Sequence, residues 1–357
     1  MAKVKEQEAI VPHEAILYKK LKKNYVQCTA CHHWCAIKPG ENGKCGVRVN
    51  INGKLYLAVY GYPAAINVDP VEKKPLFHFL PGELILSLGT VGCNFFCAFC
   101  QNWDISQWRQ IKVREDGKVT GVRGVYVPPE GIVALAKRYN SRLIAYTYNE
   151  PTVWVEYAYD IARLAVQEGM RNVFVSSGFE THHVWDLIGD YLHAINVDLK
   201  SFSDKFYKEI CGTRLKPVLE NIEFLGTKMR DKIWMEITTL IIDGYNDSEE
   251  ELREIARFIA SVNKDIPWHI TAAHPAYKMT DIKRTPPDSL LRAYEIGKEE
   301  GLNYVYVGNV SDPKHSSTYC PNCGELLIWR DWYRVLELWK ERGKCHKCGT
   351  QIPGVWQ

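Results

Sequence analysis

Seven short apolar runs alternate with amphipathic segments between residues 83 and 310, and this alternation constrains the fold more than any other feature. The runs cover residues 83–89, 142–148, 172–178, 194–200, 233–242, 268–274 and 304–310. Helix-like periodicity covers 151–169, 248–264 and 287–301, and Asp247-Ser248 and Pro287-Asp288 supply typical helix-start residues. Strands that alternate with helices favour a parallel sheet built from βαβ units. We therefore predict an α/β fold with a partial (β/α)6 barrel, similar to a TIM barrel.

Polar residues recur where the predicted strands end, which is where parallel barrels gather their functional groups. An isolated Asp-Lys pair is usually a surface ion pair of little consequence, and a single histidine or serine at a strand end is usually structural. Recurrence at successive strand ends favours a binding site over these simpler interpretations, above all for Glu150, Asp198 and Lys200. The full set at or just beyond the strand ends is Cys93, Glu150, Ser176, Ser177, Asp198, Lys200, Thr238, His274 and Asn309.

The 12 cysteines fall into three compact clusters, with Cys211 alone outside them. The first residues, MAKVKEQEAI, are charged and no run of 18 apolar residues occurs, so we expect a cytoplasmic protein that does not span a membrane. In that setting clustered cysteines indicate metal binding rather than disulfides. The net charge of +3 and the absence of a long block of like charges make nucleic acid an unexpected partner.

The central cluster, GCNFFCAFCQN, has only three cysteines, Cys93, Cys97 and Cys100, in the spacing CxxxCxxC. Gly92 before them permits a sharp turn after the first predicted strand. Three thiolates can hold a 4Fe-4S cluster and leave one iron open to a further ligand. The alternatives are a structural zinc site with a fourth ligand from elsewhere, or simply buried thiols.

CxxxCxxC with an aromatic residue, Phe99, before the third cysteine resembles the signature of the radical S-adenosylmethionine (SAM) superfamily. From about residue 25 to 310 the chain is similar to the pyruvate formate-lyase activating enzymes and to the radical SAM enzymes of the AmmeMemoRadiSam group. The resemblance implies that a 4Fe-4S cluster binds SAM through its open iron. One electron from a donor then cleaves SAM to methionine and a 5'-deoxyadenosyl radical, so no catalytic side chain beyond the cluster is assigned.

The same resemblance implies a set of SAM-binding residues. YTYNEPT stands at the family's Gly-Gly-Glu motif, with Tyr148 and Asn149 in place of the glycines and Glu150 matching the glutamate. NVDLKSF matches the Asp-Leu-Lys segment of the activating enzymes, and a carboxylate beside an ammonium group suits a zwitterionic ligand. His274 matches a histidine near SAM, with His269 as an alternative. The implied cofactor-binding residues are Phe99, Glu150, Ser176, Ser177, Asp198, Lys200 and His274.

The C-terminal cluster, CPNCG and CHKCG, has nearly the spacing of a zinc ribbon. We predict that Cys320, Cys323, Cys345 and Cys348 bind a structural zinc ion, with glycine after each pair permitting a tight turn. A rubredoxin-like iron or a nucleic-acid-binding ribbon is the alternative.

The N-terminal cluster also provides a complete set of four ligands, Cys28, Cys31, Cys35 and Cys45. Turns at Pro39-Gly40 and Asn42-Gly43 should bring Cys45 back to the other three. Thiolates suit zinc and an auxiliary 4Fe-4S cluster equally, and His32 and His33 are further candidate ligands. We favour zinc.

These observations predict a Cys-rich segment over residues 1–60, a radical SAM partial barrel over 82–312 and a zinc-ribbon-like lobe over 318–357. The expected activity is that of an activating-enzyme-like oxidoreductase, in which the radical takes hydrogen from a substrate. A glycine of a partner protein is the first candidate, and a small molecule or RNA is the alternative. A zinc-ribbon interaction protein without enzymatic activity is the alternative from another class.

Overall fold

A computed structural model describes residues 9–357, so the first eight residues of the predicted 1–60 segment lie outside it. The chain divides into two compact units. The first contains the chain up to Val68 together with Leu86–Phe96 and Cys100–Leu192. The second contains Asp69–Ile85, Cys97–Phe99 and His193–Gln357.

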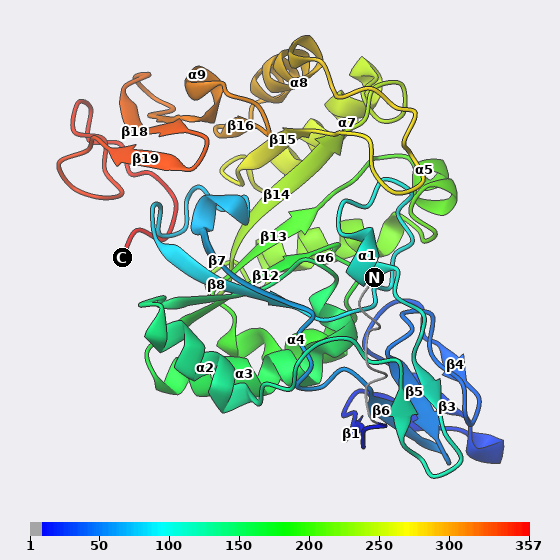
Figure 1. The fold of residues 1–357 in the computed structure, drawn as a ribbon. Coiled ribbons are helices and arrows are strands. Elements are labelled where there is room, and N and C mark those ends of the chain that lie inside the picture. The colour runs from blue at the N-terminus through cyan, green and yellow to red at the C-terminus, as the bar shows by residue number, and fades with distance from the viewer. Residues whose placement is uncertain (1–8) are drawn as a thin grey trace, which may run out of the picture. The chain divides into compact units, whose positions relative to one another are not determined.

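Eight strands form the central sheet, in the order β16-β15-β14-β13-β12-β11-β8-β7 (Figure 1). All seven predicted runs are strands in it, and β7 is the eighth. The β11·β12, β13·β14, β14·β15 and β15·β16 pairs are parallel. The sheet is open, with β7 and β16 at its edges, and the predicted α/β partial barrel is confirmed. The bounds are β7 Ala65–Pro70, β8 Leu84–Gly89, β11 Leu143–Tyr146, β12 Arg171–Ser176, β13 Ala194–Asp198, β14 Trp234–Ile241, β15 Trp268–Ala272 and β16 Val305–Gly308.

In the first unit, helices α1 (Trp103–Ser106), α2 (Pro129–Arg138), α3 (Val155–Gln167) and α4 (His182–Ile188) accompany the strands. A 3-10 turn, η3 (Pro151–Trp154), leads into α3, and together they confirm the predicted helix over 151–169. Helix α3 buries Ala158, Ile161, Ala162 and Ala165, which recur at helical spacing along one face. Helices α2 and α3 pack side by side (Figure 1).

The N-terminal part of the first unit consists of two small antiparallel sheets, β1-β6-β5 and β2-β3-β4. Strands β5 and β6 are joined by Asn52-Gly53, both with positive φ, the residue pair that two-residue hairpin turns favour. A separate hairpin pairs β9 with β10. The bounds are β1 His13–Glu14, β2 Tyr18–Lys20, η1 Lys22–Asn24, β3 Val26–Cys28, β4 Ala36–Ile37, β5 Arg48–Ile51, β6 Lys54–Leu57, β9 Lys112–Val113 and β10 Val119–Thr120.

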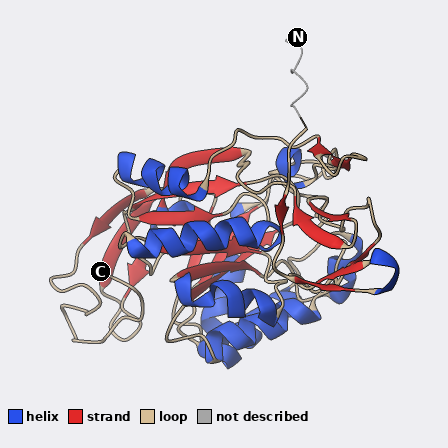
Figure 2. Ribbon diagram, turned by 90° about the horizontal axis from the view of Figure 1, so that it is seen from below, coloured by secondary structure: helices blue, strands red, loops and turns tan. Residues whose placement is uncertain are grey.

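The second unit contains α7 and α8, which confirm the other two predicted helices. Both are among the helices coloured blue in Figure 2. The Ser248 side chain caps α7 by accepting a hydrogen bond from the Glu251 amide, as its helix-start position predicts. The bounds are η2 Val71–Lys73, α5 Asp204–Glu209, α6 Lys216–Thr227, α7 Glu249–Asn263, α8 Pro287–Glu299 and α9 Pro313–Ser316. The 3-10 turn η4 (Gly189–Tyr191) ends the first unit before β13.

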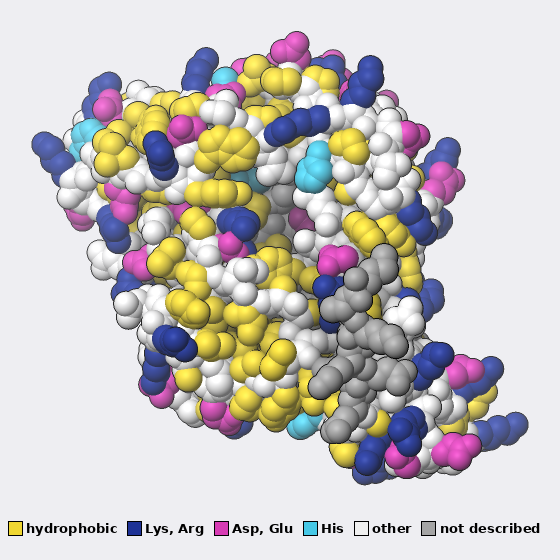
Figure 3. Space-filling view, in the orientation of Figure 1, with side chains coloured by type: hydrophobic (Ala, Val, Ile, Leu, Met, Phe, Trp, Pro, Cys, Tyr) yellow, Lys and Arg dark blue, Asp and Glu magenta, His cyan; other side chains and the backbone are white. Residues whose placement is uncertain are grey.

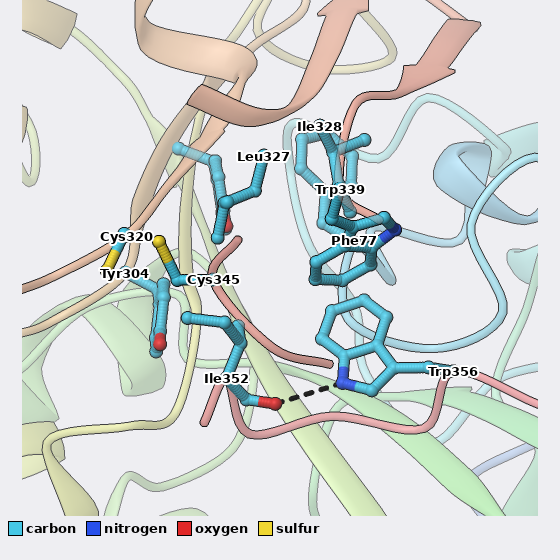
Figure 4. Packing of buried hydrophobic residues seen from close by; sticks show 10 residues of the cluster. Phe77, Tyr304, Cys320, Leu327, Ile328, Trp339, Cys345, Ile352 and Trp356 are labelled. Carbon is cyan, nitrogen blue, oxygen red and sulfur yellow. Dashed lines mark hydrogen bonds between the residues drawn. The ribbon is translucent and has the colours of Figure 1, made fainter. Parts of the chain in front are cut away.

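The C-terminal ribbon, strands β17 (Thr318–Tyr319), β18 (Leu326–Asp331) and β19 (Arg334–Glu337), packs on the second unit through a shared apolar cluster (Figure 4). Trp356 Nε1 donates a hydrogen bond of 2.9 Å to the Ile352 carbonyl at one side of it. A ribbon this small cannot bury a core of its own, so it depends on residues of the barrel. The cluster contains Phe77, Tyr304, Tyr306, Cys320, Leu327, Ile328, Trp339, Cys345, Ile352 and Trp356.

The described residues contain no helix long and apolar enough to cross a membrane. On the face in Figure 3, lysine and arginine side chains are interspersed with aspartate and glutamate, in keeping with a net charge of +3.

Candidate functional site

The loop that carries the three-cysteine motif follows β8, which ends at Gly89, and turns at Gly92, whose φ is +88°. A Cβ atom at Gly92 would lie 2.4 Å from Val47 Cγ1 and 2.7 Å from the carbonyl oxygen of Cys45. Both the backbone conformation and the space therefore require glycine. The sharp turn that the sequence predicts at Gly92 is present.

Cys93 and Cys100 lie in the first unit, each beside polar donors. The Phe95 amide donates to Cys93 Sγ at 3.4 Å, and Cys100 Sγ lies 3.2 Å from the Ser106 hydroxyl. Arg109 donates to the Cys93 carbonyl at 3.1 Å. Hydrogen-bond donors and a cation beside thiols stabilise thiolates, so these surroundings fit an anionic iron-sulfur cluster.

Cys97 and Phe99 belong to the second unit. The Ala98 amide between them donates to the Ile210 carbonyl at 2.9 Å, and the Ala98 carbonyl accepts from the Lys278 amide at 2.9 Å. A hydrogen bond with Cys211 and burial together hold the pKa of Cys97 well above its usual value, while Lys200 acts in the opposite direction. No pattern in the sequence pairs Cys211 with the motif.

Asp198 and Lys200, at the end of β13, form an ion pair of 2.9 Å beside Cys97 and Phe99. The lysine ammonium lies 5.9 Å from the centroid of the Phe99 ring, within cation-π range. Burial alone would lower the pKa of Lys200, but Asp198 and the two neighbouring thiols raise it well above its usual value. Lys200 is therefore a fixed positive charge next to the motif.

Glu150, Ser176 and Ser177 lie together in the first unit at the ends of β11 and β12. Glu150 is buried and accepts hydrogen bonds from the Ser176 hydroxyl at 2.9 Å and the Ser177 amide at 2.9 Å. Thr152 donates to the same carboxylate through its amide and hydroxyl. Burial raises the pKa of Glu150 above its usual range. Its oxygens thus bind the surrounding loops together.

A second buried carboxyl, Glu180, also contacts the Ser176 hydroxyl. Burial and the nearby charge of Glu150 raise the pKa of Glu180 to about 8, so it is largely protonated at neutral pH. Sequence reasoning missed Glu180 because it lies in a loop four residues beyond the last strand residue.

Tyr148 and Asn149, which replace the two glycines of the family motif, adopt specific conformations. Tyr148 has a φ of +70°, the left-handed region where glycine is normally found. Asn149 Nδ2 donates to the Gly92 carbonyl at 2.7 Å. Tyr148 therefore has a conformation that glycine adopts more easily, and Asn149 connects this loop to the cysteine loop.

The two candidate histidines lie at different ends of β15. His269 is buried near the start of the strand, and its Nε2 lies 2.6 Å from Glu236 Oε2. His274 is exposed two residues after the strand ends. Only His274 is at the carboxyl edge, where barrel chemistry collects.

The C-terminal cysteines form a compact ligand set. The sulfurs of Cys320, Cys323, Cys345 and Cys348 all lie within 4.8 Å of one another. The amides of Gly324 and Gly349 donate to the carbonyls of Cys320 and Cys345, and both glycines have positive φ. These are the two tight turns that the sequence predicts, and they place four thiols around one point.

The N-terminal cysteines Cys28, Cys31, Cys35 and Cys45 line one pocket in the first unit, so the predicted turn does bring Cys45 back. His33 also lines this pocket, but its Nε2 lies 2.7 Å from the Asn94 carbonyl. That hydrogen bond engages the nitrogen, so it is not free to ligate a metal.

Comparison with known proteins identifies the family of the chain. Residues 87–259 match the Radical SAM superfamily. The uncharacterised protein MJ0808 of Methanocaldococcus jannaschii is 43% identical over 345 residues, which cover 95% of this chain and 98% of that protein. The "Putative glycyl-radical enzyme activating enzyme MJ1632" of the same organism is 25% identical over 63% of this chain and 79% of its own length.

Among solved structures, a domain of a pyruvate-formate lyase-activating enzyme from Bacteroides vulgatus matches with a TM-score of 0.41 and 19% identity. The match covers 46% of this chain and 98% of that domain. The chain belongs to the radical SAM superfamily, whose members use a 4Fe-4S cluster and SAM.

Proposed function

We propose that this chain is an enzyme that binds a 4Fe-4S cluster through Cys93, Cys97 and Cys100 and reductively cleaves SAM. When bound there, the cluster would supply the one electron that reduces the sulfonium of SAM. Cleavage of the bond from sulfur to the 5'-carbon would then give methionine and a 5'-deoxyadenosyl radical. The radical takes a hydrogen atom from the substrate and becomes 5'-deoxyadenosine. A one-electron donor restores the reduced cluster.

The observation that carries this proposal is the Asp198–Lys200 ion pair beside Cys97 and Phe99. The methionyl end of SAM has an ammonium and a carboxylate group, and this pair presents the opposite charge to each. Asp198 receives the ammonium and Lys200 the carboxylate, next to a cysteine that ligates the cluster. Phe99 limits access of water to the same place.

Glu150, Ser176, Ser177 and His274 complete the proposed SAM-binding set. Glu150 acts mainly as a positioning residue, because its carboxylate already accepts hydrogen bonds from Thr152, Ser176 and Ser177. The Ser177 backbone and His274 offer polar contacts at strand ends.

The proposed substrate is a glycine residue of a partner protein, from which the radical takes the α-hydrogen. The similarity to MJ1632, whose name assigns it to the activation of a glycyl-radical enzyme, supports this choice. The four C-terminal cysteines hold a structural zinc ion in the same proposal, since their compact spacing fits one tetrahedral ion.

SAM cleavage is tested with protein reconstituted anaerobically with iron and sulfide and reduced with dithionite. We expect 5'-deoxyadenosine to form with SAM, and none to form in a Cys97→Ala variant. If the wild-type protein holds a 4Fe-4S cluster and yields no 5'-deoxyadenosine, SAM cleavage is excluded.

The substrate is tested with extract of cells grown on glycine deuterated at the α-carbon. Deuterium in the recovered 5'-deoxyadenosine, obtained with the protein fraction after nuclease treatment, is the expected result. Deuterium transfer only from the low-molecular-mass fraction, or only without nuclease, would instead indicate a small molecule or RNA.

A further inference from the structure

The four N-terminal cysteines surround a pocket rather than a point. A small cavity of about 10 Å3, counted as the space open to the centre of a water molecule, is lined by Cys28, Cys31, Cys35 and Cys45. Apolar side chains complete the wall, among them Ala30, Ile37 and Val153. Because protein interiors are normally close-packed, a hollow lined by four thiols indicates that these thiols hold a bound group rather than pack against one another.

The spacing of these sulfurs differs from that of the C-terminal set. Around one zinc ion, bonds of about 2.3 Å in tetrahedral geometry place the sulfurs about 3.8 Å apart. The C-terminal thiols meet this requirement, with 3.5 Å between Cys320 and Cys348 and 3.6 Å between Cys323 and Cys345. Within residues 9–357 that set is the only one in which three or more such ligand atoms lie within 4.8 Å of one another.

No three of the N-terminal sulfurs therefore lie that close together. A cubane places four iron atoms between its thiolates and needs this wider spacing.

The wider spacing is fixed by the backbone. Cys28 ends β3, and its amide donates to the Cys35 carbonyl at 2.9 Å. Cys31 forms a β-bridge with Glu180, which connects it to the loop after β12. Cys45 lies in a turn closed by a hydrogen bond from the Gly46 amide to the Gly43 carbonyl. These three attachments fix the backbone positions from which the thiols line the pocket.

A buried positive charge lines the same pocket. Arg48 is 2% exposed and forms an ion pair of 2.5 Å with Glu156, which is 1% exposed. Lys44 lines the pocket as well. A cluster with four thiolate ligands is anionic. Lys44 offsets part of that charge, whereas the charge of Arg48 is already balanced by Glu156.

The pocket adjoins the loop of the three-cysteine motif. The carbonyl oxygen of Cys45 lies against Gly92, where a Cβ atom would come within 2.7 Å of it. His33, which lines the pocket, contacts the Asn94 carbonyl at 2.7 Å. Gly92 and Asn94 flank Cys93, so ligands of the two sites are separated by a single layer of backbone.

We propose that Cys28, Cys31, Cys35 and Cys45 hold a second 4Fe-4S cluster, which passes single electrons to the first. A low-potential one-electron carrier protein reduces the second cluster by one electron, and that electron then moves to the first cluster, which returns the second to its oxidised state. The electron-transfer role rests on the proposed function, whereas the presence of the second cluster does not.

The test for the cluster is a triple variant, Cys93→Ser, Cys97→Ser and Cys100→Ser, reconstituted beside the wild-type protein. We expect the wild type to bind about eight irons per chain and the variant about four, a twofold loss, with the brown colour retained. A variant that is colourless and holds zinc in both four-cysteine sets overturns the proposal. Native mass spectrometry of the wild type is the second measurement, and a mass increment of one cubane instead of two also overturns it.

The two proposals fail separately in this experiment. A wild type with about four irons that cleaves SAM would overturn the second cluster alone. A variant with about four irons beside a wild type that cannot cleave SAM would overturn the proposed function alone.

The electron-transfer role is tested by electron paramagnetic resonance of the dithionite-reduced wild type. Two reduced clusters this close should broaden each other's signals, and a Cys28→Ser, Cys35→Ser variant should show the narrow signal of the first cluster alone. Signals in the wild type that equal the sum of those from the two variants would overturn electron transfer between the sites.

Discussion

Lys200 and Asp198 are joined by an ion pair of 2.9 Å, and the lysine side chain is 11% exposed whereas the aspartate side chain is 36% exposed. The aspartate can therefore accept a second cation without releasing the lysine. A cationic ligand that reaches this place meets a carboxylate already held in position.

Asp198→Asn is expected to raise the dissociation constant for SAM about 10- to 100-fold, because a hydrogen bond to a charged group contributes about 1.5–3 kcal/mol. Equilibrium dialysis with reconstituted protein measures this. The matched control is Asp204→Asn, which alters an exposed ion pair with Lys208 on α5. Equal weakening by the two substitutions would argue against direct binding by Asp198.

Cys211→Ser is expected to leave the iron content and SAM cleavage unchanged. Cys211 is fully buried and hydrogen-bonded to Cys97, and a serine hydroxyl can maintain that contact. Three cysteines are enough for the open cluster, so a fourth ligand is unnecessary. Loss of iron from this variant on anaerobic purification would mean that Cys211 ligates the cluster and that the cluster is closed.

Cys323→Ser should release the metal of the C-terminal ribbon and lower the free energy of unfolding by more than about 4 kcal/mol. Trp339 and Trp356 belong to the cluster that the ribbon shares with β16, so their fluorescence should change as well. Zinc analysis and urea denaturation followed by tryptophan emission measure both effects. Cys211→Ser, a buried thiol outside the ribbon, is the control and should retain zinc.

His78 should make the protein less stable as the pH falls from 7 to 5.5. Burial lowers its pKa to about 4, and Arg330 and His269 act in the same direction, whereas Glu236 and the Pro353 carbonyl oppose them. In the unfolded chain the imidazole has a pKa of about 6.5, so between these values the unfolded state binds the additional proton.

Stability contributed by the neutral imidazole is therefore full above pH 6.5 and is lost on acidification. His78→Phe should cost stability at pH 7, because the contacts with Tyr306 and Pro353 are lost. The difference between the two proteins should narrow by about 1 kcal/mol at pH 5.5. Urea midpoints at the two pH values measure it, with metal content checked at each, and a constant difference contradicts the assignment.

Tyr148→Gly is expected to be about 1 kcal/mol more stable than Tyr148→Ala, because alanine keeps a residue with a Cβ atom at a φ of +70°. Both substitutions remove the tyrosine side chain and its hydrogen bond from Asn67, so the comparison isolates the backbone. Urea denaturation of the two variants gives the difference. Equal stabilities would show that the loop changes conformation in the variants.

Much of the sheet could be predicted because its strands are continuous apolar runs that both faces bury, and all seven are present. Strand β7, the edge strand, was not predicted as a separate strand because its residues are mostly half-buried and carry no clear period. Helices α5 and α6 went unpredicted, although Ser203 and Pro217 are helix-start residues that could have indicated them.

The candidate site was predicted in part. Asp198 and Lys200 follow one strand, and their proximity to Cys97 is expected from parallel strands that end at the same edge. Cys211 and Glu180 could not be found in this way, because they reach the site from loops whose paths depend on tertiary packing. The difference between the two four-cysteine sets was also hidden, since residue spacing along the chain does not fix the distance between sulfurs.

Val355 and Trp356 cover the segment around His78, which the ribosome synthesises much earlier. The Val355 amide and carbonyl pair with the His78 carbonyl and the Leu80 amide, each at 2.7 Å, and Trp356 packs on the His78 ring. During synthesis the segment around His78 therefore stays without its contacts to Val355 and Trp356 until more than 270 further residues have been made. A ribosome that stops short of Ile352 releases a chain with an exposed apolar patch, which chaperones and proteases recognise.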